Sequence, residues 1–280
     1  MTTVLMAATV AASFGVANFI GGIASRRAAA LAVTANAHLL GAALLGGAVL
    51  LFPARHATLA DVTWGGVAGV TGGFAVVALY AALAHGRMSV VAPLTAAISA
   101  ALPALYDVAS GTVLRPISGL GITIALVAVI IVSASGDTES RAAMPLRAVV
   151  LAVAAGVGFS VTLIAYSFSG AESGFVPLAA ARIVSSVLLG ALTLIRSRSY
   201  LVAADVRGFT FGSGAIEAFA NIALITALRT GPLAIVAVLA AMHPVVTILL
   251  ARGFLGERLQ GVQRAGVALA LVAVVMTALP

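Results

Sequence analysis

The chain contains no cysteine and no lysine, and only 8% of its residues are charged. The absence of cysteine excludes disulfides, thiolate metal sites and thiol chemistry. In soluble domains roughly a quarter of all residues are charged. A chain with 62% hydrophobic residues and so little charge therefore cannot present a water-compatible surface. Disorder is also excluded, because it requires low hydrophobicity and high charge. The composition therefore indicates a protein embedded in a membrane.

The formal net charge of +7 is the difference between 15 basic residues, all of them arginine, and 8 acidic residues. Most of these arginines stand singly or in pairs at the ends of apolar runs, as they do around transmembrane helices whose cationic ends reach the lipid headgroups. A nucleic-acid-binding face would require clustered basic charge, which the sequence does not contain. The expected partner is the lipid bilayer rather than nucleic acid.

Charged residues, glycines and prolines divide the chain into ten apolar stretches, most of about 20 residues. Such a stretch crosses a hydrocarbon core of about 30 Å as a helix. The predicted spans are 3–24, 31–52, 63–84, 89–108, 116–135, 148–168, 175–195, 208–228, 233–252 and 259–278. The sequence predicts an all-α membrane protein with ten transmembrane helices.

The two halves of the chain resemble each other. A shift of 145 residues superimposes spans three to five on spans eight to ten without a gap, and the earlier spans align at shifts of 143 to 144. Each copy contains five helices, an odd number, so the copies must cross the membrane in opposite directions, as in many secondary transporters. The sequence predicts two inverted five-helix repeats, 1–136 and 147–280.

Short segments in both halves carry a family likeness. They are 11–19 (AASFGVANF), 88–93 (MSVVAP), 231–233 (GPL), 243–246 (HPVV) and 255–259 (LGERL). With these segments the sequence resembles, over essentially its whole length, the drug/metabolite transporter superfamily, specifically the two-repeat EamA-type transporters. The resemblance implies a ten-helix bundle around a central cavity, and a transporter that moves small metabolites, often amino acids or drug-like compounds and often outward. We expect hydrogen-bonding and small residues of spans one, three, four, six, eight and nine to line this cavity.

The sequence departs from the family pattern at several positions. Relatives often carry aspartate where Asn18 and Glu217 stand, and an aromatic residue where His243 stands. The first half has GTVLRP at 111–116 where the second half keeps the GERL signature. The coupling chemistry of this chain therefore has to be read from its own residues.

Two charged residues lie deep inside predicted spans, Arg182 in the seventh and Glu217 in the eighth. A charge near the bilayer midplane costs about 2.5–3.5 kcal/mol on insertion scales, so both are functional candidates. Glu217 shares a helix face with Asn221, four residues on. Glu217 either accepts a proton or binds a cationic substrate group, or it is a structural carboxyl paired with Arg182. Arg182 aligns with His38 of the first half, and it either neutralises a substrate carboxylate or Glu217 or has a structural role.

Further candidates lie beside the predicted cavity. His243 precedes Pro244 in the ninth span, and the proline frees a backbone carbonyl one turn earlier, which predicts a kink. His243 either carries a proton near neutral pH or forms a structural hydrogen bond at the kink. Asn18 and Tyr80 complete the candidate set.

Other residues are interpreted as architectural. Gly69 and Gly214 occupy equivalent small-residue positions in the third and eighth spans, which allow close helix packing near the repeat axis. Gly256, Glu257 and Arg258 form the family signature at a helix junction, where Glu257 complements the positive N-terminus of the tenth span.

The predicted function is a secondary transporter of a bacterial inner membrane. It would move amino acids, amines or drug-like compounds by alternating access, outward, with protons coupled through Glu217. The sequence contains no phosphate loop, serine elbow, metal-binding spacing or paired catalytic carboxylate, and it therefore predicts no enzymatic activity, metal or cofactor. A non-transporting assembly or sensory subunit and an intramembrane enzyme acting on a lipid-linked substrate are the alternatives.

The orientation and the oligomeric state stay open. Eleven arginines fall in or beside odd-numbered loops and three in even ones, which by the positive-inside rule places both termini outside. The family resemblance implies cytoplasmic termini. Both interpretations place the two termini on the same side of the membrane.

Overall fold

The computed structural model describes residues 2–25, 27–85, 88–134, 145–197, 200–255 and 261–278. Within these ranges the chain forms eleven helices and no strand. The helices are α1 (Thr2–Ser25), α2 (Ala30–Leu51), α3 (Leu59–His85), α4 (Met88–Ala109), α5 (Pro116–Ala134), α6 (Leu146–Ser167), α7 (Val176–Ser197), α8 (Ala204–Thr230), α9 (Leu233–Ala240), α10 (His243–Leu255) and α11 (Gly261–Ala278). The predicted all-α fold class is confirmed.

Six of these helices, α1, α2, α3, α6, α7 and α8, are long and apolar enough to cross a membrane. Shorter apolar segments occur at Leu94–Ala109, Gly119–Ala128 and Leu233–Thr247. Helices of this kind satisfy their own backbone hydrogen bonds, which is what a lipid environment requires. The chain is therefore a membrane protein with several spanning helices, and the count of ten spans stays a prediction.

The span predicted over 233–252, with a kink at Pro244, is interrupted at that point, because α9 ends at Ala240 and α10 begins at His243. Pro244 has no backbone N–H, so the carbonyl of Ala240 loses the donor that a regular helix would supply. The Nδ1 atom of His243 lies 3.2 Å from this carbonyl and donates to it instead. The kink expected at Pro244 is thus a break between two short helices.

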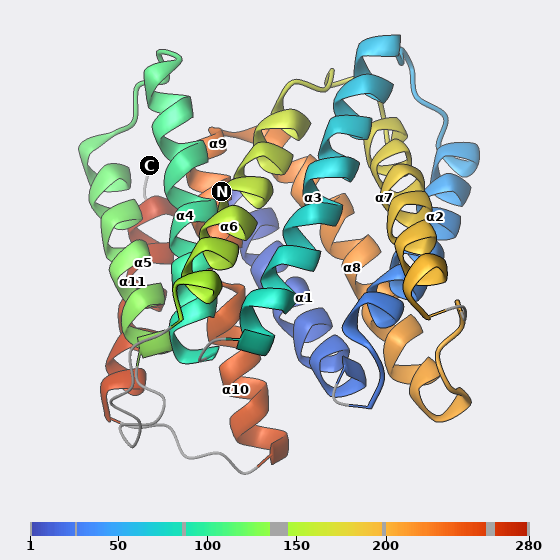
Figure 1. The fold of residues 1–280 in the computed structure, drawn as a ribbon. Coiled ribbons are helices and arrows are strands. Elements are labelled where there is room, and N and C mark those ends of the chain that lie inside the picture. The colour runs from blue at the N-terminus through green and yellow to red at the C-terminus, as the bar shows by residue number, and fades with distance from the viewer. Residues whose placement is uncertain are drawn as a thin grey trace.

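The helices pack in reciprocal pairs (Figure 1). α1 packs against α8, and α6 packs against α3; α2 also contacts α8, and α7 also contacts α3. In the same way α1 contacts α9 and α10, while α6 contacts α4. Both chain ends lie in the upper half of the view in Figure 1.

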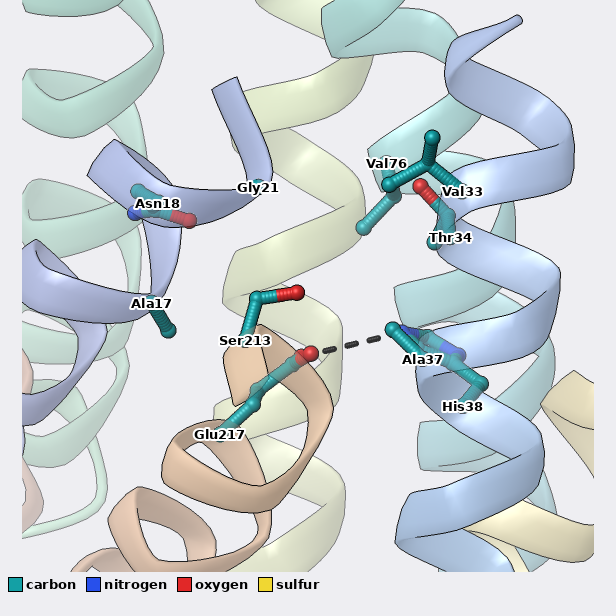
Figure 2. A pocket seen from close by; sticks show the side chains of 10 residues that line it. All are labelled: Ala17, Asn18, Gly21, Val33, Thr34, Ala37, His38, Val76, Ser213 and Glu217. Atoms are coloured by element: carbon teal, nitrogen blue, oxygen red, sulfur yellow. Dashed lines mark ion pairs between the residues drawn. The ribbon is translucent and has the colours of Figure 1, made fainter. Parts of the chain in front are cut away.

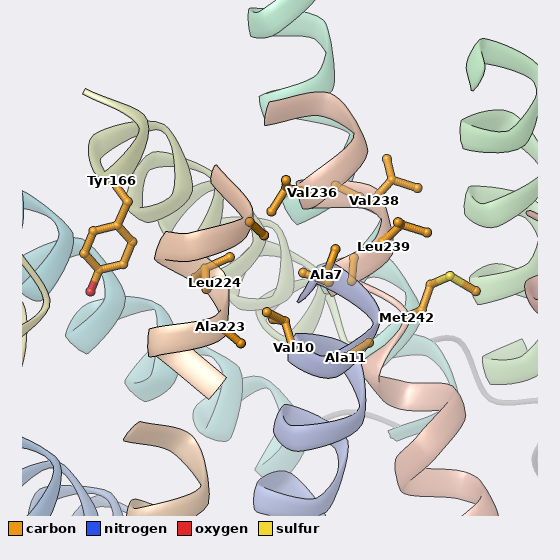
Figure 3. Packing of buried hydrophobic residues seen from close by; sticks show 14 of the residues in the cluster. Ala7, Val10, Ala11, Tyr166, Ala223, Leu224, Val236, Val238, Leu239 and Met242 are labelled. Carbon is orange, nitrogen blue, oxygen red and sulfur yellow. The ribbon is translucent and has the colours of Figure 1, made fainter. Parts of the chain in front are cut away.

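The main hydrophobic cluster takes residues from all eleven helices, and Figure 3 shows the part of it around α1, α8 and α9. Its members are mostly small or branched residues such as Ala7, Val10, Leu224, Val236 and Leu239, all almost completely buried. Lipid tails are as apolar as these side chains, so close van der Waals contact rather than water exclusion holds such helices together. The abundance of alanine at helix contacts follows from this requirement.

Polar contacts tie the α6–α7 loop to two helix ends. Asp61, in the first turn of α3, accepts a hydrogen bond from the backbone N–H of Gly170 at 2.7 Å. Arg229, at the end of α8, donates to the carbonyl of Gly174 at 2.7 Å and to the hydroxyl of Ser173 at 2.9 Å. The loop is therefore bound to α3 and α8 together.

A second set of hydrogen bonds holds the α7–α8 connection against α2. The Asn36 amide donates to the carbonyls of Ala32 and Tyr200, both at 2.8 Å. The Tyr200 hydroxyl donates to the carbonyl of Ala35 at 3.2 Å. Burial raises the pKa of Tyr200, so its hydroxyl keeps the proton that this bond requires.

Candidate functional site

The structure joins the two charged residues that the sequence placed deep inside spans. Arg182 on α7 donates from Nη2 to Oε1 of Glu217 on α8 at 2.7 Å. Arg182 is buried, whereas the side chain of Glu217 is 24% exposed. The arginine therefore neutralises the carboxylate, and Glu217 still reaches open space. This pairing is one of the alternatives that the sequence left open for both residues.

His38 on α2 faces the same carboxylate oxygen. Its Nε2 atom lies 3.6 Å from Oε1 of Glu217, and its Nδ1 atom lies 3.0 Å from the hydroxyl of Ser185 on α7. The Ser185 hydroxyl also lies within hydrogen-bond distance of the carbonyl of Arg182, at 3.2 Å. Two tautomers of the ring fit this contact: either Nδ1 donates to the hydroxyl, or it accepts the Ser185 proton and Nε2 carries the hydrogen.

The other ring nitrogen of His38, Nε2, faces the carboxylate of Glu217 and has no hydrogen-bond partner among the described residues. A proton on Nε2 would turn this contact into a charge-assisted interaction. The geometry accordingly offers a place for a proton between His38 and Glu217.

A pocket opens beside Glu217 between α1, α2 and α8 (Figure 2). It has about 50 Å³ of room for water-sized molecules, enough for a few of them. Its lining residues are Ala17, Asn18 and Gly21 on α1, Val33, Thr34, Ala37 and His38 on α2, Val76 on α3, and Ser213 and Glu217 on α8. In this conformation the pocket accepts a small polar group rather than a drug-sized molecule.

The lining differs from the one that the sequence predicted. α1, α3 and α8 contribute as expected, whereas α4, α6 and α9 supply none of its lining residues. α2, which the prediction omitted, supplies Thr34 and His38, the two polar groups facing α8 in Figure 2. His38 could have been found from its alignment with Arg182, but Thr34 and Ser213 carried no signal in the sequence.

Asn221 does not interact with the carboxylate of Glu217. Its amide donates to the backbone carbonyl of Glu217 at 2.7 Å, and the side chain is buried. A bond from residue i+4 back to residue i uses the amide inside its own helix. Asn221 is therefore a neighbour of the candidate site and does not line the pocket.

His243 lies at the break between α9 and α10, bonded to the carbonyl of Ala240. It packs close to α1, where a Cβ atom on Gly15 would come within 2.9 Å of the His243 carbonyl. His243 is not among the residues that line the pocket. Its position matches the structural alternative, a hydrogen-bonded histidine at a kink.

The remaining candidates have different outcomes. Asn18 lines the pocket from α1. Tyr80 lies in α3, but its side chain is outside the described part of the structure. The signature residues Gly256, Glu257 and Arg258 also lie outside the described residues.

Gly69 and Gly214 lie at close helix contacts. A Cβ atom on Gly214 would come within 2.5 Å of the Ala37 carbonyl oxygen on α2. A Cβ atom on Gly69 would meet the backbone of Ala181 on α7 in the same way. Both glycines allow backbone-to-backbone packing, and their partners are α2 and α7.

Asp107 is a buried acidic residue that the sequence placed at a span end. Its Oδ2 atom accepts a hydrogen bond from the backbone N–H of Ala234 at 2.8 Å, and its Oδ1 atom accepts one from the Thr112 hydroxyl at 2.8 Å. Ala234 lies in the first turn of α9, whose free N–H groups favour a carboxylate. Asp107 thus caps the first half of the broken helix. Among the described residues no group of three His, Cys, Asp or Glu side chains is placed to hold a metal ion.

Comparisons with known proteins agree with this architecture. A solved structure titled "Crystal structure of protein" aligns with a TM-score of 0.77 and 17% sequence identity, over 97% of this chain and 98% of that one. At this identity the likeness concerns the fold alone, and it shows that the helical arrangement of this chain is a known fold. Residues 146–279 match the family model of the EamA-like transporter family. The second half of the chain is thus similar to this family, which confirms the resemblance found in the sequence. No curated protein matches the sequence.

Proposed function

We propose that the protein is a secondary transporter that moves small metabolites across a bacterial inner membrane by alternating access, outward, with Glu217 as its proton-coupling residue. The observation that carries the proposal is the partly exposed carboxylate of Glu217. It lies in the middle of α8, between Arg182 and His38 and beside a small polar pocket. Charged groups inside spans usually mark a substrate or ion pathway.

The reciprocal helix contacts support two inverted repeats. Exchange of the halves converts the α1–α8 contact into the α6–α3 contact, and the α2–α8 contact into the α7–α3 contact. The glycines follow the same exchange, because Gly214 packs on Ala37 and Gly69 packs on Ala181. Two halves that make equivalent contacts can interchange their conformations, which is the basis of alternating access.

The transport proposal is tested in proteoliposomes with a trapped pH-sensitive dye. Substrate panels of amino acids, amines and cationic drugs are added outside, and proton movement and uptake are followed. We expect proton movement with at least one class for the wild type, and none for Glu217→Gln. Glu172→Gln, the same change in the exposed α6–α7 loop, is the matched control and should behave as the wild type.

Two outcomes would contradict the proposal. Wild-type coupling in the Glu217→Gln protein would remove Glu217 from the mechanism. No movement of any compound, with a folded protein and intact membranes, would favour a non-transporting subunit.

The inverted arrangement has its own test, because the chain has no cysteine. Ala57→Cys lies between α2 and α3, and Ala203→Cys lies at the corresponding connection between α7 and α8. A membrane-impermeant thiol reagent should label the two single-cysteine proteins from opposite sides of the membrane. Labelling from the same side would contradict the inverted repeat.

A further inference from the structure

Three of the five polar side chains that line the pocket, Thr34, Ser213 and Glu217, present acceptor atoms rather than donors. The Thr34 hydroxyl donates its proton to the carbonyl of Ala30 at 2.9 Å, and the Ser213 hydroxyl donates to the carbonyl of Thr210 at 2.8 Å. A hydroxyl whose proton is engaged in this way offers only its lone pairs to a ligand.

The carboxylate of Glu217 has the same character, because its oxygens carry only lone pairs and Oε1 accepts a hydrogen bond from Arg182. Asn18 and His38 differ from these residues, since an amide and a neutral imidazole each carry both a donor and an acceptor.

These polar groups lie on two facing helices. Ser213 and Glu217 are four residues apart on α8, and Thr34 and His38 are four residues apart on α2, so each pair lies on one helix face. Figure 2 shows the two pairs turned toward the space between the helices. A ligand group in this space meets oxygen lone pairs of Thr34 on one side and of Ser213 and Glu217 on the other.

We propose that this pocket recognises a protonated primary amino group, carried by an amine or by an amino acid. Three N–H donors match an acceptor-lined site that contains a carboxylate, and hydrogen bonds with a charged donor are the stronger kind. A quaternary ammonium group has the same charge but no N–H to donate to these acceptors. A carboxylate without an amino group would place its own lone pairs against those of the pocket. The inference rests on the proposed transport function and specifies its substrate class.

Four probes of matched shape separate these possibilities. n-Butylammonium has the amino group alone, n-butyltrimethylammonium has the charge without N–H donors, norvaline has the amino group with a carboxylate, and pentanoate has the carboxylate alone. Ligand-induced shifts of the unfolding temperature of the purified protein measure binding, because a ligand of the folded state stabilises it.

We expect n-butylammonium or norvaline to bind at least about tenfold more tightly than n-butyltrimethylammonium or pentanoate. The shifts of the unfolding temperature with n-butylammonium and with norvaline are then compared. The larger shift shows whether the amino group is carried by an amine or by an amino acid. Equal binding of n-butyltrimethylammonium, tighter binding of pentanoate, or no shift with any probe would overturn the inference.

Variants of the lining test the site itself. Thr34→Val removes one acceptor without removing a charge, and it should weaken the binding of the preferred probe several-fold. Thr226→Val on α8 is the matched control, since Thr226 also donates to the carbonyl four residues before it but does not line the pocket. Equal effects of both variants would argue against this pocket.

Transport in the same preparations separates the two proposals. If n-butyltrimethylammonium is moved as well as n-butylammonium, the donor requirement fails and the transport function stands. If probes bind as expected but no compound moves in the proteoliposomes, the binding site stands and the transport function fails.

Discussion

The two halves of the chain use the same helix packing and different chemistry. Gly69 packs on Ala181 in one place, and Gly214 packs on Ala37 in the equivalent place. The charged positions of the two halves do not match in this way. His38 occupies the position in the first half that is equivalent to Arg182 in the second, and Gly72 occupies the position equivalent to Glu217. Both halves therefore direct a basic group at one shared carboxylate.

The difference shows which properties the internal repeat constrains. Close backbone packing allows little variation, since any side chain at Gly214 would meet the backbone of α2. The polar positions tolerate change as long as buried charge is balanced. A single carboxylate between two unequal partners, a permanent cation and a titratable ring, makes the site asymmetric inside a symmetric frame.

The largest expected effect comes from removal of the permanent cation. Arg182→Met leaves Glu217 without its partner, and breaking a buried ion pair costs about 3–5 kcal/mol. Thermal and denaturant unfolding in detergent micelles measure the loss. The double variant Arg182→Met, Glu217→Met should recover most of it, because no uncompensated charge is left. A single variant as stable as the wild type would show that the ion pair is not a structural element.

The next effect tests the shared packing. Gly214→Ala and Gly69→Ala should each lower the free energy of unfolding by about 1–3 kcal/mol, because the added methyl group meets backbone atoms that cannot move aside. Gly212→Ala on the same helix is the control, since its Cβ atom would meet nothing within 4 Å. Strongly unequal losses at Gly69 and Gly214 would contradict equivalent packing in the two halves.

A smaller effect is expected at the titratable partner. His38→Leu removes the hydrogen bond to Ser185 and should cost about 1 kcal/mol, clearly less than Arg182→Met, because no charge is left unpaired. The same unfolding measurements compare the two variants directly. If His38→Leu destabilises as much as Arg182→Met, the two basic positions carry equal weight and the asymmetry disappears.

The smallest effect is expected at the counterpart of Glu217. A Cβ atom on Gly72 would lie 3.3 Å from the Thr162 hydroxyl, a side-chain contact that a small shift relieves. Gly72→Ala should change stability by less than about 1 kcal/mol and leave transport unchanged. Loss of transport in this folded variant would place a second functional position in the first half.

Much of the membrane architecture was predictable because it depends on local properties. Apolar runs gave helices close to the predicted spans, and the charges inside spans pointed to Arg182 and Glu217. The partners of those charges were harder to predict, since Asn221 shares a helix face with Glu217 and yet bonds to its backbone. His38 entered the sequence argument only through alignment with Arg182.

The sequence alone determined the membrane class, the family resemblance and the two charges that stand apart from the span ends, because hydrophobicity and charge act along the chain. Only the tertiary structure decided that Arg182 and His38 meet at one oxygen of Glu217 and that α2 lines the pocket. These features depend on contacts between helices far apart in sequence, where the direction of each side chain follows from packing and hydrogen bonding rather than from composition.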